Sequence, residues 1–374
     1  MRMRNGNQVP LLIAPRIQRY DWGDPVFLPR TLRLAEGVGP CAEAWYGAHP
    51  SAPAAARIAG AWARLDHLMR ERGPDILGPA AWDRFGALPY LLKLLAAASP
   101  LSIQVHPPRE QAEAGFAAEE AAGVPRSHPS RRYRDPHAKP ELLVALTDFD
   151  VLHGFRSCEE IAAILETLPE VRTLLPSFQP TAEGLRAFLR SYYALPGVVV
   201  EDALRGLLRR LKEEDERSPL GRHEPAYWVL RAHEAGQQRA APDRGLLLVY
   251  LMSLVHLRPG EALFTPPGVL HAYLRGAGVE LMASSDNVLR AGLTSKHVDP
   301  EEVLRVARVE PGSGPLLEEV AAESGVEWSY PTPVPEAQRN NQAGPPGHRG
   351  TLGRTFLKGF SQWTSRPVVD AAGG

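Results

Sequence analysis

The sequence predicts a β-rich α+β protein: an antiparallel barrel or jelly roll with an inserted helical segment. Three observations indicate this fold. The 374 residues include 36 prolines and 33 glycines, and so many turn-forming residues suit short strands. Apolar and polar residues alternate over Leu101–Pro107, whereas residues 157–236 show helical periodicity. Strand character then returns, so the helices are expected to interrupt a sheet rather than to follow it.

The first 155 residues are predicted to form strands and turns with few helices. Tyr20–Gly23 indicates a turn, and Pro108–Gly123 is rich in Ala, Glu and Gln, which predicts a helix that ends at its glycine. Glu141–Val151 is an apolar run and predicts one buried strand. In Leu101–Pro107, a strand would bury Leu101, Ile103 and Val105 on one face and align Ser102, Gln104 and His106 on the other.

About four helices with short loops are predicted for the insert, residues 156–241. Ser157 with Glu160 indicates a capping box at its start. Further helical patterns cover Thr181–Tyr192, Glu201–Glu216 and Glu224–Ala235.

Three strand-like runs follow the insert, over Leu246–Leu257, Glu261–Thr265 and Val269–Leu274, with Pro-Gly turns between them. The last of these is expected to be a return strand. Asp299-Pro300 then has the residues of a helix start, with Asp at the cap and Pro at the first helical position.

Bulk composition excludes several classes of protein. The formal net charge is -1, so no overall field favours nucleic acid or an anionic membrane. The two cysteines, Cys41 and Cys158, do not form a disulfide framework. No apolar run approaches the ~20 residues of a membrane span, and the N-terminus lacks a signal-peptide core. The expectation is a soluble, cytoplasmic protein.

Four residues from separate segments are candidate metal ligands. Gln104 and His106 share a strand face, Glu141 opens a strand, and His271 lies on the predicted return strand on the same face as Tyr273. Two histidines, a glutamate and a glutamine suit an open, catalytic zinc site, because a structural zinc favours cysteine. The residues alone leave a second interpretation open, namely a solvated strand face, a surface carboxylate and a hydrogen-bonded barrel histidine.

Several longer segments resemble type I mannose-6-phosphate isomerases (phosphomannose isomerases), which are zinc enzymes with a cupin fold. The resemblance runs in order from about residue 10 to residue 335. The segments that carry it are Tyr20–Gly23, Ala42–Pro50, Leu88–Lys93, Leu101–Pro107, Lys139–Leu142, Pro266–Leu274 and Glu280–Val298.

The resemblance implies an aldose-ketose isomerase that interconverts mannose 6-phosphate and fructose 6-phosphate. Zinc-assisted proton transfer between C1 and C2 would pass through an enediol. One zinc per chain would be held by Gln104, His106, Glu141 and His271. Arg290 would lie in the active site near the sugar, and Lys139 would be an acid/base group. Other positions implied to bind the sugar phosphate are Ser102, Lys93, Glu280, Asp286, Lys296 and Trp22.

Two departures from the family pattern affect these expectations. The family commonly has a histidine immediately before the Lys-Pro-Glu triplet, but here that position is Ala138, and His137 lies one residue earlier. The family also continues into a second β-domain. Here residues 338–374 are basic and rich in Gly and Pro, which predicts a disordered tail. The second β-domain is therefore expected to be missing or incomplete.

The predicted organisation is therefore a catalytic cupin-like domain of residues 1–155 and 242–300, an insert at 156–241, a remnant of the second domain at 301–337, and the tail. A monomer is expected. The alternative is a catalytically impaired or non-catalytic cupin-like protein that binds a sugar phosphate. A metal-dependent oxygenase would be expected to have a histidine-rich iron site instead.

Overall fold

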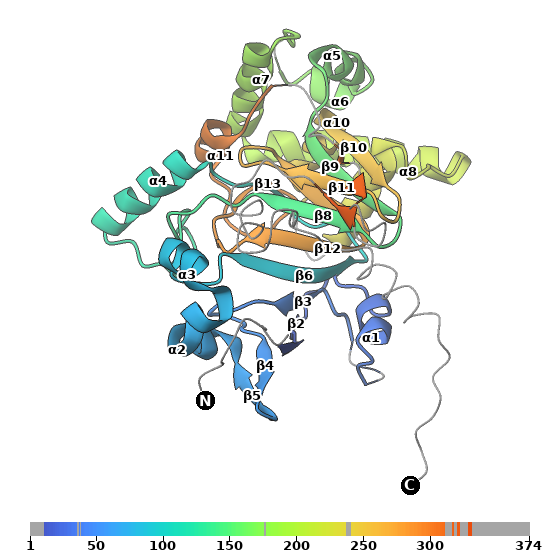
Figure 1. The fold of residues 1–374 in the computed structure, drawn as a ribbon. Coiled ribbons are helices and arrows are strands. Elements are labelled where there is room, and N and C mark those ends of the chain that lie inside the picture. The colour runs from blue at the N-terminus through green and yellow to red at the C-terminus, as the bar shows by residue number, and fades with distance from the viewer. Residues whose placement is uncertain are drawn as a thin grey trace, which may run out of the picture.

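The computed structural model describes residues 11–35, 37, 39–175, 177–236, 241–310, 316–317, 320–321 and 328–330. One long strand, β12 (His271–Ala283), organises the fold (Figure 1). Its first part pairs with β7 and β9, and its second part pairs with β6 and β8, all antiparallel. These partners are β6 (Tyr90–Ala97), β7 (Ile103–Val105), β8 (Glu141–Ala145) and β9 (Phe149–Phe155).

The two parts of β12 meet at Gly276, which has a φ of +142°. A Cβ atom at this position would come within 2.6 Å of Cγ of the Phe149 ring and 2.7 Å of the Asp148 carbonyl oxygen. Only glycine combines this backbone conformation with so close an approach. The bend therefore lets one strand take part in both sheets of the barrel.

The remaining strands extend these two sheets or form small separate ones. The larger sheet adds β2 (Arg16–Gln18), β3 (Glu43–Tyr46), β11 (Ala262–Thr265) and β14 (Leu316–Leu317). The smaller sheet adds β10 (Met252–Leu257) and β13 (Leu289–Gly292). The separate strands are β1 (Leu12–Ala14), β4 (Ala55–Ile58) and β5 (Ala61–Arg64), which pair together, and β15 (Val320–Ala321) with β16 (Trp328–Ser329).

Helices cover the outside of the smaller sheet (Figure 1). Ile103 and Val105 of β7 are fully buried in a hydrophobic core that they share with these helices. Because side chains alternate along a strand, Gln104 between them points to the opposite face. The helices from 158 to 251 are α5 (Cys158–Glu166), α6 (Pro169–Arg172), α7 (Ala182–Ala194), α8 (Gly197–Arg217), α9 (Pro225–Ala235) and α10 (Gly245–Leu251).

The other helices lie along the barrel and near the N-terminal strands. They are α1 (Phe27–Thr31), α2 (Leu65–Leu77), α3 (Pro79–Phe85), α4 (Arg109–Ala121) and α11 (Pro300–Val306). Four local predictions are confirmed: the turn at Tyr20–Gly23, the helix that ends before Gly123, the Ser157 capping box and the Asp299 cap.

Three strand predictions are wrong in detail. Glu141–Val151 is not one strand, because residues 146–148 leave the extended conformation and separate β8 from β9. The first half of Leu246–Leu257 is helix α10, since a short buried apolar run fits either structure. The predicted return strand starts only at His271, continues to Ala283 and does not pair with β11.

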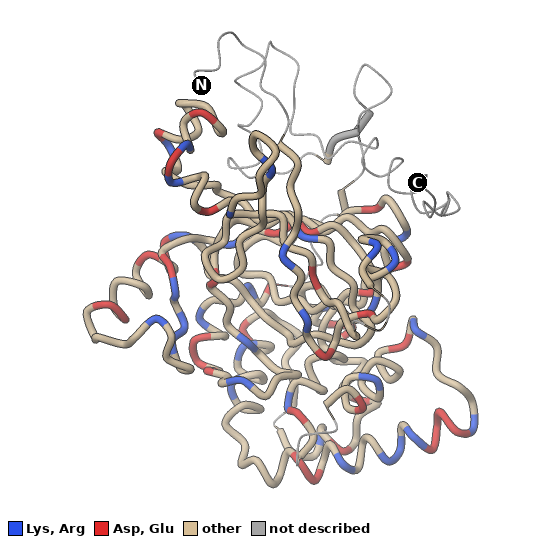
Figure 2. The backbone as a smooth tube through the Cα atoms, turned by 90° about the horizontal axis from the view of Figure 1, so that it is seen from below, with Lys and Arg blue, Asp and Glu red and all other residues tan. Residues whose placement is uncertain are grey.

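The prediction of a β-rich antiparallel fold with helices is confirmed. The predicted tail, residues 338–374, lies outside the described residues, as does most of 311–337. Among the described helices, none is long and apolar enough to cross a membrane. Basic and acidic residues are interspersed along the backbone (Figure 2), in agreement with the net charge of -1.

Candidate metal centre and active site

Three buried side chains meet inside the barrel. Glu141 opens β8, His271 opens β12, and His106 directly follows β7. His106 Nε2 lies 3.2 Å from Glu141 Oε1, and His271 Nε2 lies 3.2 Å from Glu141 Oε2. Their potential ligand atoms all lie within 4.8 Å of one another. The structure thus brings together three of the four predicted ligands.

Hydrogen bonds orient both imidazoles toward the centre of this group. His106 Nδ1 donates to the backbone oxygen of Asn287 at 2.7 Å, and His271 Nδ1 donates to that of Val269 at 3.0 Å. A carbonyl oxygen only accepts, so Nδ1 carries a hydrogen in each ring and Nε2 is the nitrogen directed at the centre. Burial, aided by Lys139, lowers the pKa of His106 to about 4, and its ring is therefore neutral near pH 7.

The charge of Glu141 is retained despite its burial. Desolvation alone would raise the pKa of this carboxyl, but Lys139 and the two histidines outweigh it and hold the pKa well below its usual range. Lys139 Nζ lies 3.1 Å from Glu141 Oε1 and is also buried. His106 Nε2 and Glu141 Oε2 have no hydrogen-bond partner in the described chain. Buried polar atoms without a hydrogen-bond partner need another explanation, and a cation bound between these two atoms would supply it.

Gln104 completes the predicted ligand set. It lies opposite His271 in the β7–β12 pairing, and its side-chain Nε2 is 3.3 Å from His271 Nε2. A half-turn of the amide presents Oε1 to the same point, so the side chain can supply an oxygen ligand. Two imidazole nitrogens, one carboxylate and one amide oxygen fit zinc.

A second buried ion network lies beside this centre. Lys93 Nζ is 2.8 Å from Glu280 Oε2 and 3.1 Å from Glu43 Oε1, and the Tyr273 hydroxyl donates to Glu280 at 2.8 Å. Burial would lower the pKa of Lys93, but Glu280 and Glu43 outweigh it and raise the pKa. Lys93 and Glu280, both predicted to bind substrate, are therefore ion-paired with each other in this structure.

Arg290 has two other cations, Arg134 and Lys296, in its neighbourhood. Arg290 of β13 is the register partner of Gln104. Burial and the neighbouring Arg134 lower the pKa of Arg290, and Arg290, burial and Arg134 lower the pKa of Lys296. Like charges close together in this way are suited to an anion such as phosphate.

The other predicted residues take different positions. Asp286 is partly exposed and lies 3.2 Å from His49 Nε2; hydrogen bonding to His49 is the main cause that lowers the pKa of Asp286. Ser102 immediately precedes β7 and is partly buried, while Trp22 stacks on Tyr20. His137, the neighbour of Ala138, is exposed.

Two residues of the site were missed at the sequence level. Asn287 is fully buried, and its side chain accepts from the backbone N–H of Arg134 at 2.7 Å and donates to the carbonyl oxygens of Asp135 at 2.7 Å and His137 at 2.9 Å. Arg134 was not among the predicted site residues. Asn287 lies in the matching segment Glu280–Val298, but no local pattern indicates its role, because its partners lie about 150 positions away in sequence.

A buried His-Glu-His group with an adjacent amide and lysine, inside an antiparallel barrel, defines a metal-dependent enzyme. The catalytic domain of type I phosphomannose isomerases matches residues 11–158. Mannose-6-phosphate isomerase of Salmonella typhimurium is 37% identical over 322 residues, which cover 85% of this chain and 80% of that protein. The human enzyme of the same name is 30% identical over 368 residues, with 87% and 81% covered.

Solved structures agree with these relatives. The structure of the Salmonella typhimurium mannose 6-phosphate isomerase bound to its substrate and a zinc atom superposes with a TM-score of 0.77 at 35% identity. The superposition covers 87% of this chain and 81% of that one. The chain belongs to the mannose-6-phosphate isomerase family.

Proposed function

We propose that this chain interconverts mannose 6-phosphate and fructose 6-phosphate, with one zinc ion held by Gln104, His106, Glu141 and His271. The observation that carries the proposal is the His106–Glu141–His271 group, whose ligand atoms converge within 4.8 Å in a chain of this family. The structure of the Salmonella typhimurium relative with its substrate, fructose 6-phosphate, and zinc supports both the substrate and the metal.

The reaction moves a proton between C1 and C2 of the open-chain sugar, and negative charge develops on oxygen as the enediol forms. A zinc ion bound here supplies Lewis acidity that stabilises this charge. The groups of the chain have the remaining tasks: binding the phosphate, orienting the sugar and holding the transferred proton.

Lys139 is the group best placed to hold a proton beside the reacting carbons. Its Nζ is buried and lies 3.1 Å from Glu141 Oε1, so it reaches the edge of the ligand group. We infer that Lys139 donates to, or accepts from, the sugar oxygens and carbon there. Arg290 and Lys296 would bind the phosphate, with the Ser102 hydroxyl as a further donor.

The domain organisation is also proposed. The residues of α5–α9 form an insert between β9 and β10, but this insert shares one hydrophobic core with β7 and β9. We infer that it folds together with the catalytic domain of residues 1–155 and 242–300. A cytoplasmic monomer remains the expectation.

A coupled isomerase assay on purified protein, with and without a chelator, tests the proposed function. We expect activity with mannose 6-phosphate that the chelator removes and added zinc restores, with about one zinc per chain by metal analysis. The non-catalytic alternative predicts sugar-phosphate binding without turnover. Turnover that is insensitive to metal removal would contradict the role given to the ligand group.

A further inference from the structure

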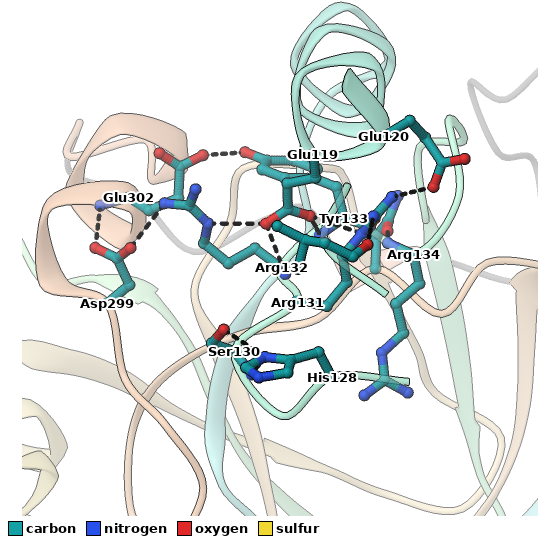
Figure 3. Close-up of polar contacts among 12 residues, drawn as sticks. Glu119, Glu120, His128, Ser130, Arg131, Arg132, Tyr133, Arg134, Asp299 and Glu302 are labelled. Carbon is teal, nitrogen blue, oxygen red and sulfur yellow. Dashed lines mark hydrogen bonds and ion pairs between the residues drawn. The ribbon is translucent and has the colours of Figure 1, made fainter. Parts of the chain in front are cut away.

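The segment Arg131–Asp135 has three arginines, and two of them, Arg131 and Arg132, form ion pairs with acidic side chains. Arg131 contacts Glu119 at 2.9 Å and Glu120 at 2.8 Å. Arg132 contacts Glu119 at 3.2 Å and Asp299 at 2.8 Å. Figure 3 shows this network between α4 and the start of α11, with the Arg134 side chain turned away from it. In the part of the chain that the structure describes, no acid lies within ion-pair distance of Arg134.

The backbone of Arg134 is nevertheless fixed to the metal centre. Its N–H donates to Asn287 Oδ1 at 2.7 Å, and the backbone oxygen of the same Asn287 accepts from His106 Nδ1 at 2.7 Å. One fully buried residue therefore connects Arg134 to a ligand of the proposed zinc. The position of this exposed arginine relative to the active site is set by the fold.

Arg134 lies close to the two cations already proposed to bind phosphate, because its N–H bonds to Asn287, which precedes Arg290 by three residues. Its charge acts on both Arg290 and Lys296 and opposes their protonation. Arg290 and Lys296 belong to one segment and Arg134 to another. Asp286, an acid of the same region, has its main partner in His49 at 3.2 Å, and Arg134 makes a smaller contribution to lowering the pKa of Asp286. Unpaired like charges are unfavourable beside one another, and an anion between them removes the repulsion.

We propose that Arg134 is a third ligand of the substrate phosphate, together with Arg290 and Lys296, and that it strengthens the preference for phosphorylated sugars. This inference rests on the proposed function. A guanidinium offers a planar pair of donors that matches two phosphate oxygens, while the exposed position keeps it away from the reacting carbons. Arg134 should therefore act on substrate binding and not on the proton transfer.

The test compares Arg134→Gln with Arg126→Gln. Arg126 is an exposed arginine in the same loop between α4 and β8, and it pairs with Glu120. Both variants lose one positive charge. We expect Arg134→Gln to raise the KM for mannose 6-phosphate about tenfold, with kcat and zinc content unchanged, whereas Arg126→Gln stays near the wild type. Arg134→Lys should recover part of the loss, because it keeps the charge but not the planar donors.

Inorganic phosphate provides a readout that does not depend on turnover. Calorimetric titration of the zinc-loaded protein should show phosphate binding weakened by a similar factor in Arg134→Gln only. Equal effects of the two substitutions, or unchanged phosphate binding in Arg134→Gln, would overturn the proposal. If the wild type lacks isomerase activity, the proposed function fails, while the phosphate titration still decides the role of Arg134.

Discussion

Replacement of Asn287 by alanine should destabilise the protein while leaving the metal bound. The side chain makes three short hydrogen bonds, at 2.7, 2.7 and 2.9 Å, to the backbone of Arg134, Asp135 and His137. At roughly 1 kcal/mol for each buried bond, Asn287→Ala should lower the free energy of unfolding by about 3 kcal/mol. The bond from His106 goes to the main-chain oxygen of Asn287 and survives the substitution.

Urea unfolding of the zinc-loaded protein measures this difference, and metal analysis of the same samples measures zinc content. The control is Ser130→Ala, which removes an exposed hydroxyl from the same loop between α4 and β8. It should change the free energy of unfolding by less than ~0.5 kcal/mol. Asn287→Asp tests the two hydrogen bonds that the side-chain amide donates. It keeps an acceptor for the Arg134 N–H but places an oxygen opposite the carbonyl oxygens of Asp135 and His137, so it should also destabilise the protein. A loss below ~1 kcal/mol in Asn287→Ala would refute the reasoning.

Three further predictions concern the site and its surroundings. His271→Ala should remove zinc and isomerase activity together, and full metal occupancy in that variant would disprove the ligand assignment. Arg290→Ala should lose at least ~2 kcal/mol of transition-state stabilisation, measured as kcat/KM, while its thermal melt stays like that of the wild type; unchanged kinetics would count against the assignment. Burial alone would raise the pKa of Glu302, but hydrogen bonds from Arg305 and Tyr133 outweigh it and lower the pKa below its ordinary value of 4.5. As the pH falls below 4.5, Glu302 is protonated in the unfolded chain before it is protonated in the folded protein, so the free energy of unfolding should decrease. Glu302→Gln should flatten this part of the profile, and an unaltered profile would exclude Glu302 as a contributor.

The metal centre was accessible to sequence reasoning because its pattern is local. The alternation around Gln104 and His106 places both on one strand face, and the structure confirms that Ile103 and Val105 are buried on the other. That these residues meet Glu141 and His271 could not follow from alternation, since it depends on which strands pair. The resemblance to a known family supplied this information.

Other parts of the molecule could not be predicted for the same physical reason. The run at Leu246–Leu257 is apolar throughout its first half, so its period does not distinguish helix from strand, and packing against the neighbouring helices decides the outcome. Arg134 is an ordinary surface residue in sequence. Only the tertiary contacts of its neighbours show that it differs from Arg131 and Arg132.

The bent strand β12 has a consequence for the order of folding. It pairs with strands on both sides in two sheets, and its contact with Gln104 spans 167 residues of chain. Contacts between residues so far apart in sequence are slow to form, because a large loop must close before the contact can stabilise the folded state. Both sheets therefore depend on the late arrival of one segment. The ligand His271 arrives with that segment, so the complete metal site should assemble only as the barrel closes, and metal should not nucleate folding.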